Sequence, residues 1–490
     1  MKKILVIILF LSVGYSQKEY NIKHIVEQSG VYKKKFSDEI VNGNVYRMYD
    51  DIKVPLGKMR NGKKEGKWME WYDNGTKKEE QNFKNGEPDG IWIWWYMNEQ
   101  KKEEGTWKNG KQDGLYTEWY SHRWKHGEGN YKKGKQDGLW TWWYKDGNID
   151  KEEKYDGGYK IEETIYTYYK SGKKESKGSL TEGKRNGLFT YWNENGEKIK
   201  EGSYVNDLME GEWYFSFINK ASEQRESLTG SFRSGDGGNL NKNSDVPQNG
   251  RHGLFTGFFD NGQKLSEEHY RDGIRIGKFI GWYKNGTKRL EYYYNDDGTR
   301  DSTRPITRWY ENGQKKFEGT YKAGKKDGPR TLWHKNGQKK FEGSYKAGEK
   351  DELWTLWYEN GRKKFEGTYK DGEKDELWTL WYKNGKKKKE GMYKARKKDE
   401  IWTLWYKNGR KRIKGAYNAG EKDEIWTFWY ENGKKNKEGT YKAGKKDELW
   451  TLWYENARKK MEGTYEAGKL VSRECWDKSG NEKECREPLN

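Results

Sequence analysis

The sequence has few of the residues from which metal sites, disulfide frameworks and aliphatic cores are built. Its 490 residues include 2 cysteines, 6 histidines and 6 prolines, and only 31% of them are hydrophobic. No zinc-ligand spacing, phosphate-binding loop or Gly-x-Ser-x-Gly nucleophile motif occurs. We therefore predict a protein that is not an enzyme and that uses no cofactor and no metal.

Long apolar runs are also missing, with one exception at the N-terminus. Lys2 and Lys3 precede an apolar stretch, residues 4–14, and Tyr15-Ser16-Gln17 fits a cleavage site. The stretch is too short to span a bilayer comfortably and is followed at once by polar sequence. We predict a signal peptide at residues 1–16, a mature chain that begins near Gln17, and a secreted protein of the periplasm or the cell surface.

Aromatic residues and glycine take the place of the missing aliphatic residues. The chain has 27 Trp, 37 Tyr and 60 Gly, and 36% of its residues are charged. A disordered chain would be poor in aromatics, so this composition indicates a folded protein. The aromatic side chains must then supply the core of a thin fold.

A 24-residue period decides the fold class. The marker is a Trp before an aromatic residue, and it recurs without drift at Trp309, Trp333, Trp357, Trp381, Trp405, Trp429 and Trp453. Upstream the same step joins Trp71, Trp95, Trp119 and Trp143. We predict an all-β protein, an elongated single-layer antiparallel sheet of tandem 24-residue β-hairpins. At two strand spacings per repeat, the array would be on the order of 150 Å long.

One repeat, residues 353–376, shows the expected hairpin. Residues 353–358 read as a strand, and Asn360-Gly361 predicts a type I′ turn with positive φ at both positions. Residues 363–370 form the return strand, and a second, longer turn through 371–376 leads to the next hairpin. The glycine at the centre of the return strand, Gly367 here, is expected to make room for a Trp or Tyr of the adjacent strand. Alternation alone leaves open which face is buried.

These residues resemble the MORN repeat, in its bacterial variant form. Phe317-Glu-Gly-Thr-Tyr321, Gly324-Lys325, Gly328 and Asn336-Gly337 match the family pattern position by position. The period is slightly longer than the family's, and Asp-Glu replaces Asp-Gly in later copies such as Asp375-Glu376, which we expect to stiffen or reshape that turn. The resemblance implies an interaction or scaffolding repeat; bacterial members are often labelled antitoxin-like.

The repeats divide the chain into six parts. These are the signal peptide 1–16, an N-terminal segment 17–56, a first array 57–218, a flexible insertion 219–249, a second array 250–470 and a C-terminal cap 471–490. In the cap, Cys475 and Cys485 flank a turn symmetrically, so we predict a disulfide; two free buried thiols are the alternative.

The candidate binding site is a basic, aromatic patch in the second array. Residues 357–380 carry a net charge of −1, whereas residues 381–404 carry +6 and residues 405–428 carry +3. The candidate residues are Trp381, Tyr382, Lys386, Lys388, Arg396, Trp402, Trp405, Tyr406 and Arg410. A lysine-rich face that only keeps the sheet soluble is the alternative.

These features together lead to an expected function. We expect an exported, non-catalytic scaffold that binds a protein or another component of the cell envelope. A glycan-binding or anionic-lipid-binding surface module is the alternative, with the chain peripheral to the membrane at most. Nucleic acid is the least expected partner for an exported chain. The repeated Asp-Glu pairs, such as Asp351-Glu352, favour a charge-balanced edge over a calcium-binding column.

Overall fold

The computed structural model describes residues 18–485, so the predicted signal peptide lies outside the described residues. The chain divides into two compact units. Unit 1 ends at Ser216 and also includes Phe232–Leu240, whereas unit 2 comprises Phe217–Ser231 and the chain from Asn241 on. Apart from a short 3-10 helix, η1 (Ile22–His24), the regular elements of the described residues are β-strands. None of the described helices is long and apolar enough to span a membrane.

Unit 1 contains the strands up to β18, and β19 and β20 contribute residues to both units. Their bounds are β1 (Glu19–Asn21), β2 (Ile25–Gln28), β3 (Val31–Lys34), β4 (Gly43–Tyr49), β5 (Ile52–Arg60), β6 (Lys63–Trp71), β7 (Lys77–Lys84), β8 (Glu87–Pro88), β9 (Gly90–Trp95), β10 (Lys101–Lys108), β11 (Lys111–Trp119), β12 (Lys125–Lys132), β13 (Lys135–Trp143), β14 (Ile149–Asp156), β15 (Tyr159–Tyr168), β16 (Lys174–Thr181), β17 (Lys184–Trp192), β18 (Lys198–Val205), β19 (Leu208–Ile218) and β20 (Arg225–Gly235).

Unit 2 contains the remaining strands. They are β21 (Arg251–Phe259), β22 (Lys264–Arg271), β23 (Ile274–Trp282), β24 (Lys288–Tyr294), β25 (Ile306–Trp309), β26 (Lys315–Lys322), β27 (Lys325–Trp333), β28 (Lys339–Lys346), β29 (Glu349–Trp357), β30 (Lys363–Lys370), β31 (Glu373–Trp381), β32 (Lys387–Lys394), β33 (Lys397–Trp405), β34 (Lys411–Asn418), β35 (Glu421–Trp429), β36 (Lys435–Lys442), β37 (Lys445–Trp453), β38 (Lys459–Glu466), β39 (Lys469–Trp476) and β40 (Glu482–Lys483).

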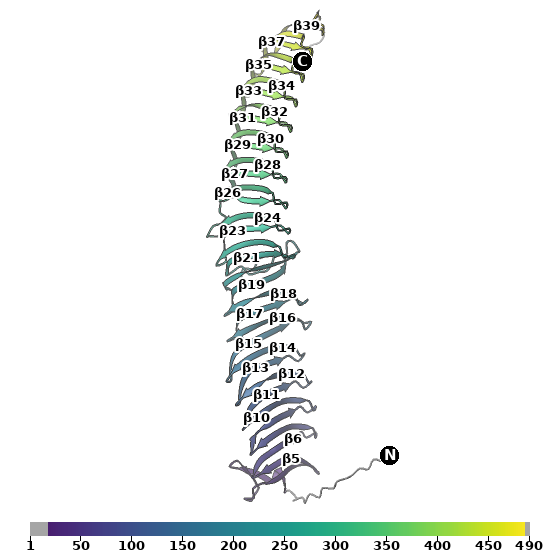
Figure 1. Cartoon of the computed structure of the whole chain (residues 1–490), viewed down its shortest axis with the longest axis vertical. Helices are drawn as coiled ribbons and strands as arrows, with labels where there is room; N and C mark the ends of the chain where they lie inside the picture. The colour runs from purple at the N-terminus through teal and green to yellow at the C-terminus, as the bar shows by residue number, and fades with distance from the viewer. Residues whose placement is uncertain (1–17, 486–490) are drawn as a thin grey trace, which may run out of the picture. The chain divides into compact units, whose positions relative to one another are not determined.

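Within unit 2, each strand from β26 to β38 pairs antiparallel with the strands before and after it in sequence (Figure 1). Every odd-numbered strand from β29 to β37 begins 24 residues after the previous odd-numbered one. The prediction of an antiparallel sheet built from tandem 24-residue hairpins is therefore confirmed.

The insertion predicted to be flexible, residues 219–249, contains the strand β20. Two of its side chains contact neighbouring strands: the Phe232 ring centroid lies 6.4 Å from that of Trp213, and the Thr229 hydroxyl donates to the Thr256 carbonyl at 3.4 Å. The sequence prediction missed this strand because β20 departs from the period and carries neither the Trp marker nor an Asn-Gly turn. It still has the alternation of a half-buried strand.

The N-terminal segment of unit 1 is a cap with an aliphatic core. β1 pairs with β4 in parallel, in contrast to the antiparallel repeats. Its buried cluster is Tyr20, Ile25, Val41, Val45, Leu56, Met59 and Trp68. Terminal repeats of an array have a neighbour on one side only, so they need a capping segment to cover their core.

The hairpin turns differ from the prediction in type. In the Glu359-Asn360-Gly361 loop, only Gly361 has a positive φ, 77°, and its N–H donates to the Tyr358 carbonyl. The register also shifts between Leu356 and Trp357. This is a three-residue loop with a bulge, so the type I′ prediction is wrong. The Asn360 amide in this loop donates to the Lys383 carbonyl of the next repeat.

The two-residue turn with positive φ at both positions lies at the other end of the repeat. Asp371 and Gly372 have φ of 48° and 80°, and Lys370 pairs directly with Glu373. The strand β31 therefore resumes at Glu373, where a longer turn through Glu376 was predicted. Glu376 itself has a φ of 55°, the left-handed conformation that Gly328 adopts at the same position. The Asp-Glu copies thus keep the backbone shape of Asp-Gly, and the expected reshaping does not occur.

Candidate binding surfaces

The two faces of the unit 2 sheet carry different side chains. We call the face that holds Trp354, Phe365 and Gly367 the glycine face, and the face that holds Leu353, Thr355 and Glu366 the threonine face. Trp354 is 4% exposed and Trp402 is 1% exposed, whereas Leu353 is 56% exposed. The structure therefore answers the question that alternation left open: in the repeats that have it, the first Trp is buried in the core.

On the glycine face, the indole of one strand lies over the glycine of the strand before it. A Cβ on Gly343 would lie 2.7 Å from Trp354 Cδ2, and Gly367, Gly391, Gly415 and Gly439 meet Trp378, Trp402, Trp426 and Trp450 in the same way. The predicted role of these glycines is confirmed. At Gly319 and Gly463 the neighbours are Arg330 and Leu470, because those repeats lack the Trp.

Three contacts join each repeat to the next. The Tyr358 hydroxyl donates to the Trp381 carbonyl at 3.0 Å, and the Asn360 amide donates to the Lys383 carbonyl at 3.0 Å. On the threonine face, Thr355 donates to Glu366, which also pairs with Lys363. The Lys363 ammonium lies 5.7 Å from the ring centroid of Trp381 in the following repeat. One Tyr, one Asn and one Lys of the repeat thus contact the next repeat, whereas the Thr355–Glu366 hydrogen bond lies within one repeat.

An exposed aliphatic column runs along the threonine face of unit 2. It consists of Leu353, Leu377, Ile401, Ile425 and Leu449, which occupy one position in five consecutive repeats and are between 51% and 64% exposed. The paired positions on the intervening strands are Thr368, Met392, Ala416, Thr440 and Thr464. Unit 1 shows the same position exposed at Ile91, Leu115, Leu139 and Leu188. Scattered apolar residues on a surface are ordinary, whereas larger exposed apolar patches are typical of interaction surfaces.

Glutamates with strained backbone lie beside this column. Glu352, Glu376, Glu400, Glu424 and Glu448 have φ between 54° and 60°, where several other repeats have glycine. Glu424 and Glu448 line a surface groove together with Ile401, Ile425 and Thr440. Non-glycine residues in such a conformation cost on the order of 1 kcal/mol each and persist mainly where function or packing requires them.

The chain belongs to the MORN repeat family. The sequence model of the MORN repeat variant matches ten segments, at residues 64–85, 88–109, 136–156, 185–206, 251–272, 306–323, 326–347, 353–371, 377–395 and 425–443. The matches include repeats on both sides of β20. MORN repeats are generally non-catalytic scaffold modules.

No curated protein matches this MORN repeat chain. Solved structures that resemble it include TcdB2-TccC3-Cdc42 (9% identity, TM-score 0.17, covering 90% of this chain and 27% of that one). Another is TcdB2-TccC3, with 10% identity, a TM-score of 0.14 and coverage of 90% and 31%. A third is the Photorhabdus luminescens Tc holotoxin pore, with 8% identity and a TM-score of 0.14; the match covers 90% of this chain and 22% of that one. This chain spans less than a third of their length, and likenesses at these scores support no inference.

The basic patch predicted from sequence does not form one surface in the MORN sheet. Trp402 is buried on the glycine face, so its place in an accessible patch was wrong. Lys386 and Arg396 lie just beyond opposite ends of β32, an eight-residue strand about 26 Å long. The net charge of a segment could not show where its residues lie, because residues that are adjacent in sequence are placed on opposite faces or at the edges of the sheet.

The other patch residues have structural partners. The Tyr382 and Tyr406 hydroxyls donate to the Trp405 and Trp429 carbonyls at 2.9 and 2.8 Å. Lys386 and Arg410 donate to turn carbonyls of the next repeat, Asn408 and Asn432, and Arg396 pairs with Glu373. Lys388 lies 5.7 Å from the Tyr382 ring centroid, and Trp381 and Trp405 are half-buried beneath lysines.

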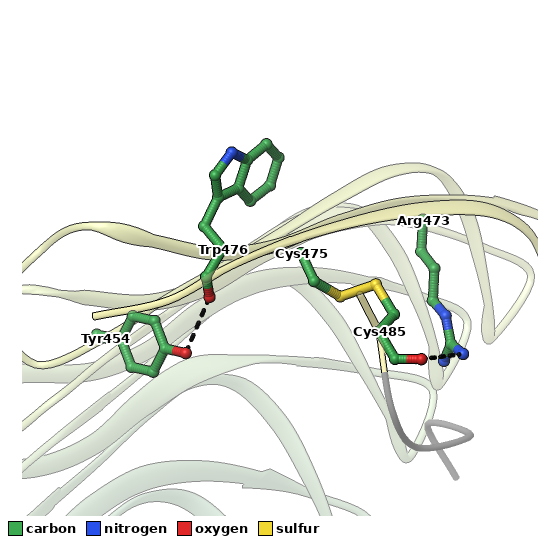
Figure 2. The surroundings of a disulfide bond; sticks show 5 residues. All are labelled: Tyr454, Arg473, Cys475, Trp476 and Cys485. Carbon is green, nitrogen blue, oxygen red and sulfur yellow. Dashed lines mark hydrogen bonds between the residues drawn. A yellow bond between two sulfur atoms is a disulfide. The ribbon is translucent and has the colours of Figure 1, made fainter. Parts of the chain in front are cut away.

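The C-terminal cap joins Cys475 to Cys485, with their Cα atoms 5.5 Å apart (Figure 2). Cys475 lies on β39 and pairs with Lys483 of β40, so the bond closes the last hairpin. The Tyr454 hydroxyl donates to the Trp476 carbonyl at 3.0 Å, which continues the Tyr contact of the repeats into the cap. Arg473 donates to the Cys485 carbonyl at 3.3 Å.

Two observations concern the titratable groups. Among residues 18–485, no group of three or more His, Cys, Asp or Glu side chains is placed to hold a metal ion. Lys200 of unit 1 is half-buried, with its ammonium 5.0 Å from the Tyr191 ring centroid and 5.1 Å from that of Trp213. Burial, and then the charge of Arg185, lowers the pKa of Lys200 to about 8.

Proposed function

We propose that this protein is an exported, non-catalytic scaffold that binds a protein partner of the cell envelope along the threonine face of unit 2. The observation that carries the proposal is the exposed aliphatic column, from Leu353 to Leu449. The sheet does not need aliphatic residues there, because Lys278 occupies the equivalent position in β23. Covering a half-exposed Leu or Ile adds about 1 kcal/mol, so five of them add about 5 kcal/mol before the costs of association.

The strained glutamates indicate that the partner is positively charged. They place a carboxylate beside each aliphatic side chain, at an interval of about 10 Å along the sheet. A partner that fits would present apolar side chains with Lys or Arg between them. Export is supported by the sequence of residues 1–17 and by the disulfide in the cap, since disulfides persist mainly outside the reducing cytosol.

The test is cross-linked capture from the envelope fraction with three forms of the chain. In the first variant, Leu377→Thr, Ile401→Thr and Ile425→Thr remove apolar surface while keeping strand propensity. In the matched control, Leu377→Ile, Ile401→Val and Ile425→Val keep the surface apolar. We expect the parent and the control to capture the same proteins and the Thr variant to lose them, with unchanged circular dichroism. Equal capture by all three forms would exclude the column as the binding site.

Export is tested separately by the mass of the chain recovered from the cell envelope or the medium. We expect a mature N-terminus near Gln17 and fractionation outside the cytoplasm. A chain that keeps Met1 and stays in the cytoplasm would refute export, and it would leave the test of the aliphatic column unaffected.

A further inference from the structure

The glycine face of unit 2 carries a column of lysines, one in each of five consecutive repeats. Its members are Lys350, Lys374, Lys398, Lys422 and Lys446, and their ammonium groups lie between 4.5 and 5.5 Å from the ring centroid of the Trp four residues on. Each also lies over a Tyr of the next repeat, as Lys398 does over Tyr417 at 4.7 Å. The rings therefore hold these ammonium groups in fixed places on the sheet.

Two repeats add a further lysine to this column. At the position where neighbouring repeats have Phe365, Ile413 or Met461, the chain has Lys389 and Lys437. The Lys389 ammonium lies 4.5 Å from the Trp402 ring centroid, and that of Lys398 lies 5.5 Å from the same ring. We call residues 374, 389 and 398 the first lysine cluster, and residues 422, 437 and 446 the second.

The positive charge of these clusters is not neutralised within the described part of the chain. None of the six lysines forms an ion pair there, whereas Lys363, Lys387 and Lys435 of the threonine face each pair with a Glu. Partial burial, and then repulsion by the two neighbouring lysines, lowers the pKa of both Lys389 and Lys437. Replacing a Phe or Ile by a half-buried, unpaired lysine is unfavourable for folding. An anion that binds there would offset both the cost of burying the charge and the repulsion between the lysines.

The spacing of the charges selects the kind of anion. The column repeats every two strands, about 10 Å, and Lys389 and Lys437 lie four strands apart, about 19 Å. A polysaccharide with one carboxylate or sulfate per disaccharide carries its charges at an interval comparable to that ~10 Å spacing. Duplex DNA carries one charge per about 1.7 Å of its axis, far denser than the column.

We propose that the glycine face of unit 2 binds an acidic polysaccharide, which crosses the strands along the lysine column and is held most tightly at the two lysine clusters. The chain would run perpendicular to β31–β37, with its anionic groups over successive lysines. This site lies on the face opposite the aliphatic column, and it does not depend on the protein partner proposed for that column.

The experiment measures binding of hyaluronan fragments, which carry one carboxylate per disaccharide, to the full chain at low salt. In the test variant, Lys389→Leu and Lys437→Leu place an apolar residue where neighbouring repeats have Phe, Ile or Met, so the fold should be kept. In the control, Lys364→Gln and Lys388→Gln remove the same charge from exposed positions over Tyr358 and Tyr382. We expect at least a tenfold loss of affinity in the test variant and less than a twofold change in the control.

A second readout is chemical. Hyaluronan should protect Lys389 and Lys437 from acetylation, and it should leave the labelling of Lys364 and Lys388 unchanged. The Thr variant of the aliphatic column should bind hyaluronan as the parent does, so that failure of either proposal is seen separately. No binding by the parent, or equal binding by the Lys389→Leu, Lys437→Leu variant, would overturn the inference. Suppose instead that the parent binds anionic vesicles or single-stranded DNA but not hyaluronan, and that the Lys389→Leu, Lys437→Leu variant loses this binding. That result would also overturn the inference.

Discussion

Gly343→Ala tests whether the array depends on the packing of an indole over a glycine. The added methyl group would lie 2.7 Å from both Cδ2 and Cε2 of Trp354, and 2.8 Å from Cγ. The indole cannot move away freely. Its N–H donates to Ser344 at 3.0 Å, and the rings of Phe341 and Tyr345 lie 4.5 and 5.0 Å away. The backbone of Gly343 does not have a positive φ, so alanine brings no strain of its own.

The expected cost is that of an overpacked core, about 1–3 kcal/mol. Because repeat arrays open locally, this should appear in the repeat that carries the change. Hydrogen exchange followed by mass spectrometry should show peptides from β28 and β29 exchanging about 5- to 150-fold faster, which is that free energy converted at 1.4 kcal/mol per tenfold. Peptides from β36 and β37 should be unchanged.

Gly319→Ala is the matched control, since it changes the same position one repeat earlier. There the nearest atoms to the added methyl group are Phe317 Cζ at 3.1 Å and Arg330 Cγ at 3.2 Å, and the arginine can move. Alanine also restricts the unfolded chain, which offsets part of any cost. We expect less than a threefold change in exchange. Equal effects of the two substitutions would show that the indole is not what requires glycine.

Three further predictions concern other parts of the chain. Glu376→Gly should slow exchange in β30 and β31 by about fivefold, because it removes about 1 kcal/mol of left-handed strain, whereas Glu376→Ala should not; equal effects would show that no strain is stored there. The exported protein should give a linked Cys475–Cys485 peptide and no free thiol on mass spectrometry, and reduction should destabilise the cap by about 2–3 kcal/mol; alkylation of both cysteines without reduction would contradict this. The pKa of Lys200 is lower in the folded chain, about 8, than in the unfolded chain, so the unfolded state binds more protons between these values. Stability of β17–β19 should therefore rise from pH 8 to about 10.5, and Lys200→Met should raise it at pH 7 and abolish the slope; an unchanged slope in that variant would rule Lys200 out.

Much of the candidate site was beyond sequence reasoning, and the reasons lie in particular residues. The net charge of residues 381–428 drew attention to this segment. It could not separate Lys386, which bonds the next turn, from Lys389, which joins a lysine cluster on the glycine face. Aligning the repeats to one another does show the signal, because Lys389 and Lys437 replace apolar residues. The exposed column from Leu353 to Leu449 gave no signal, since Leu beside Trp reads as core.

The sequence by itself determined the repeat, the hairpin and the role of the central glycines. A 24-residue period and a glycine at each strand centre are properties of the chain alone, and each repeat contacts only its neighbours. Only the tertiary structure decided which Trp is buried. Trp354 and Trp357 are three residues apart, but the bulge at Leu356 and Trp357 and the glycine of the preceding strand give Trp354 alone a place to lie flat. That register decides which tryptophan is buried, which leucine is exposed and which lysine has an ion-pair partner.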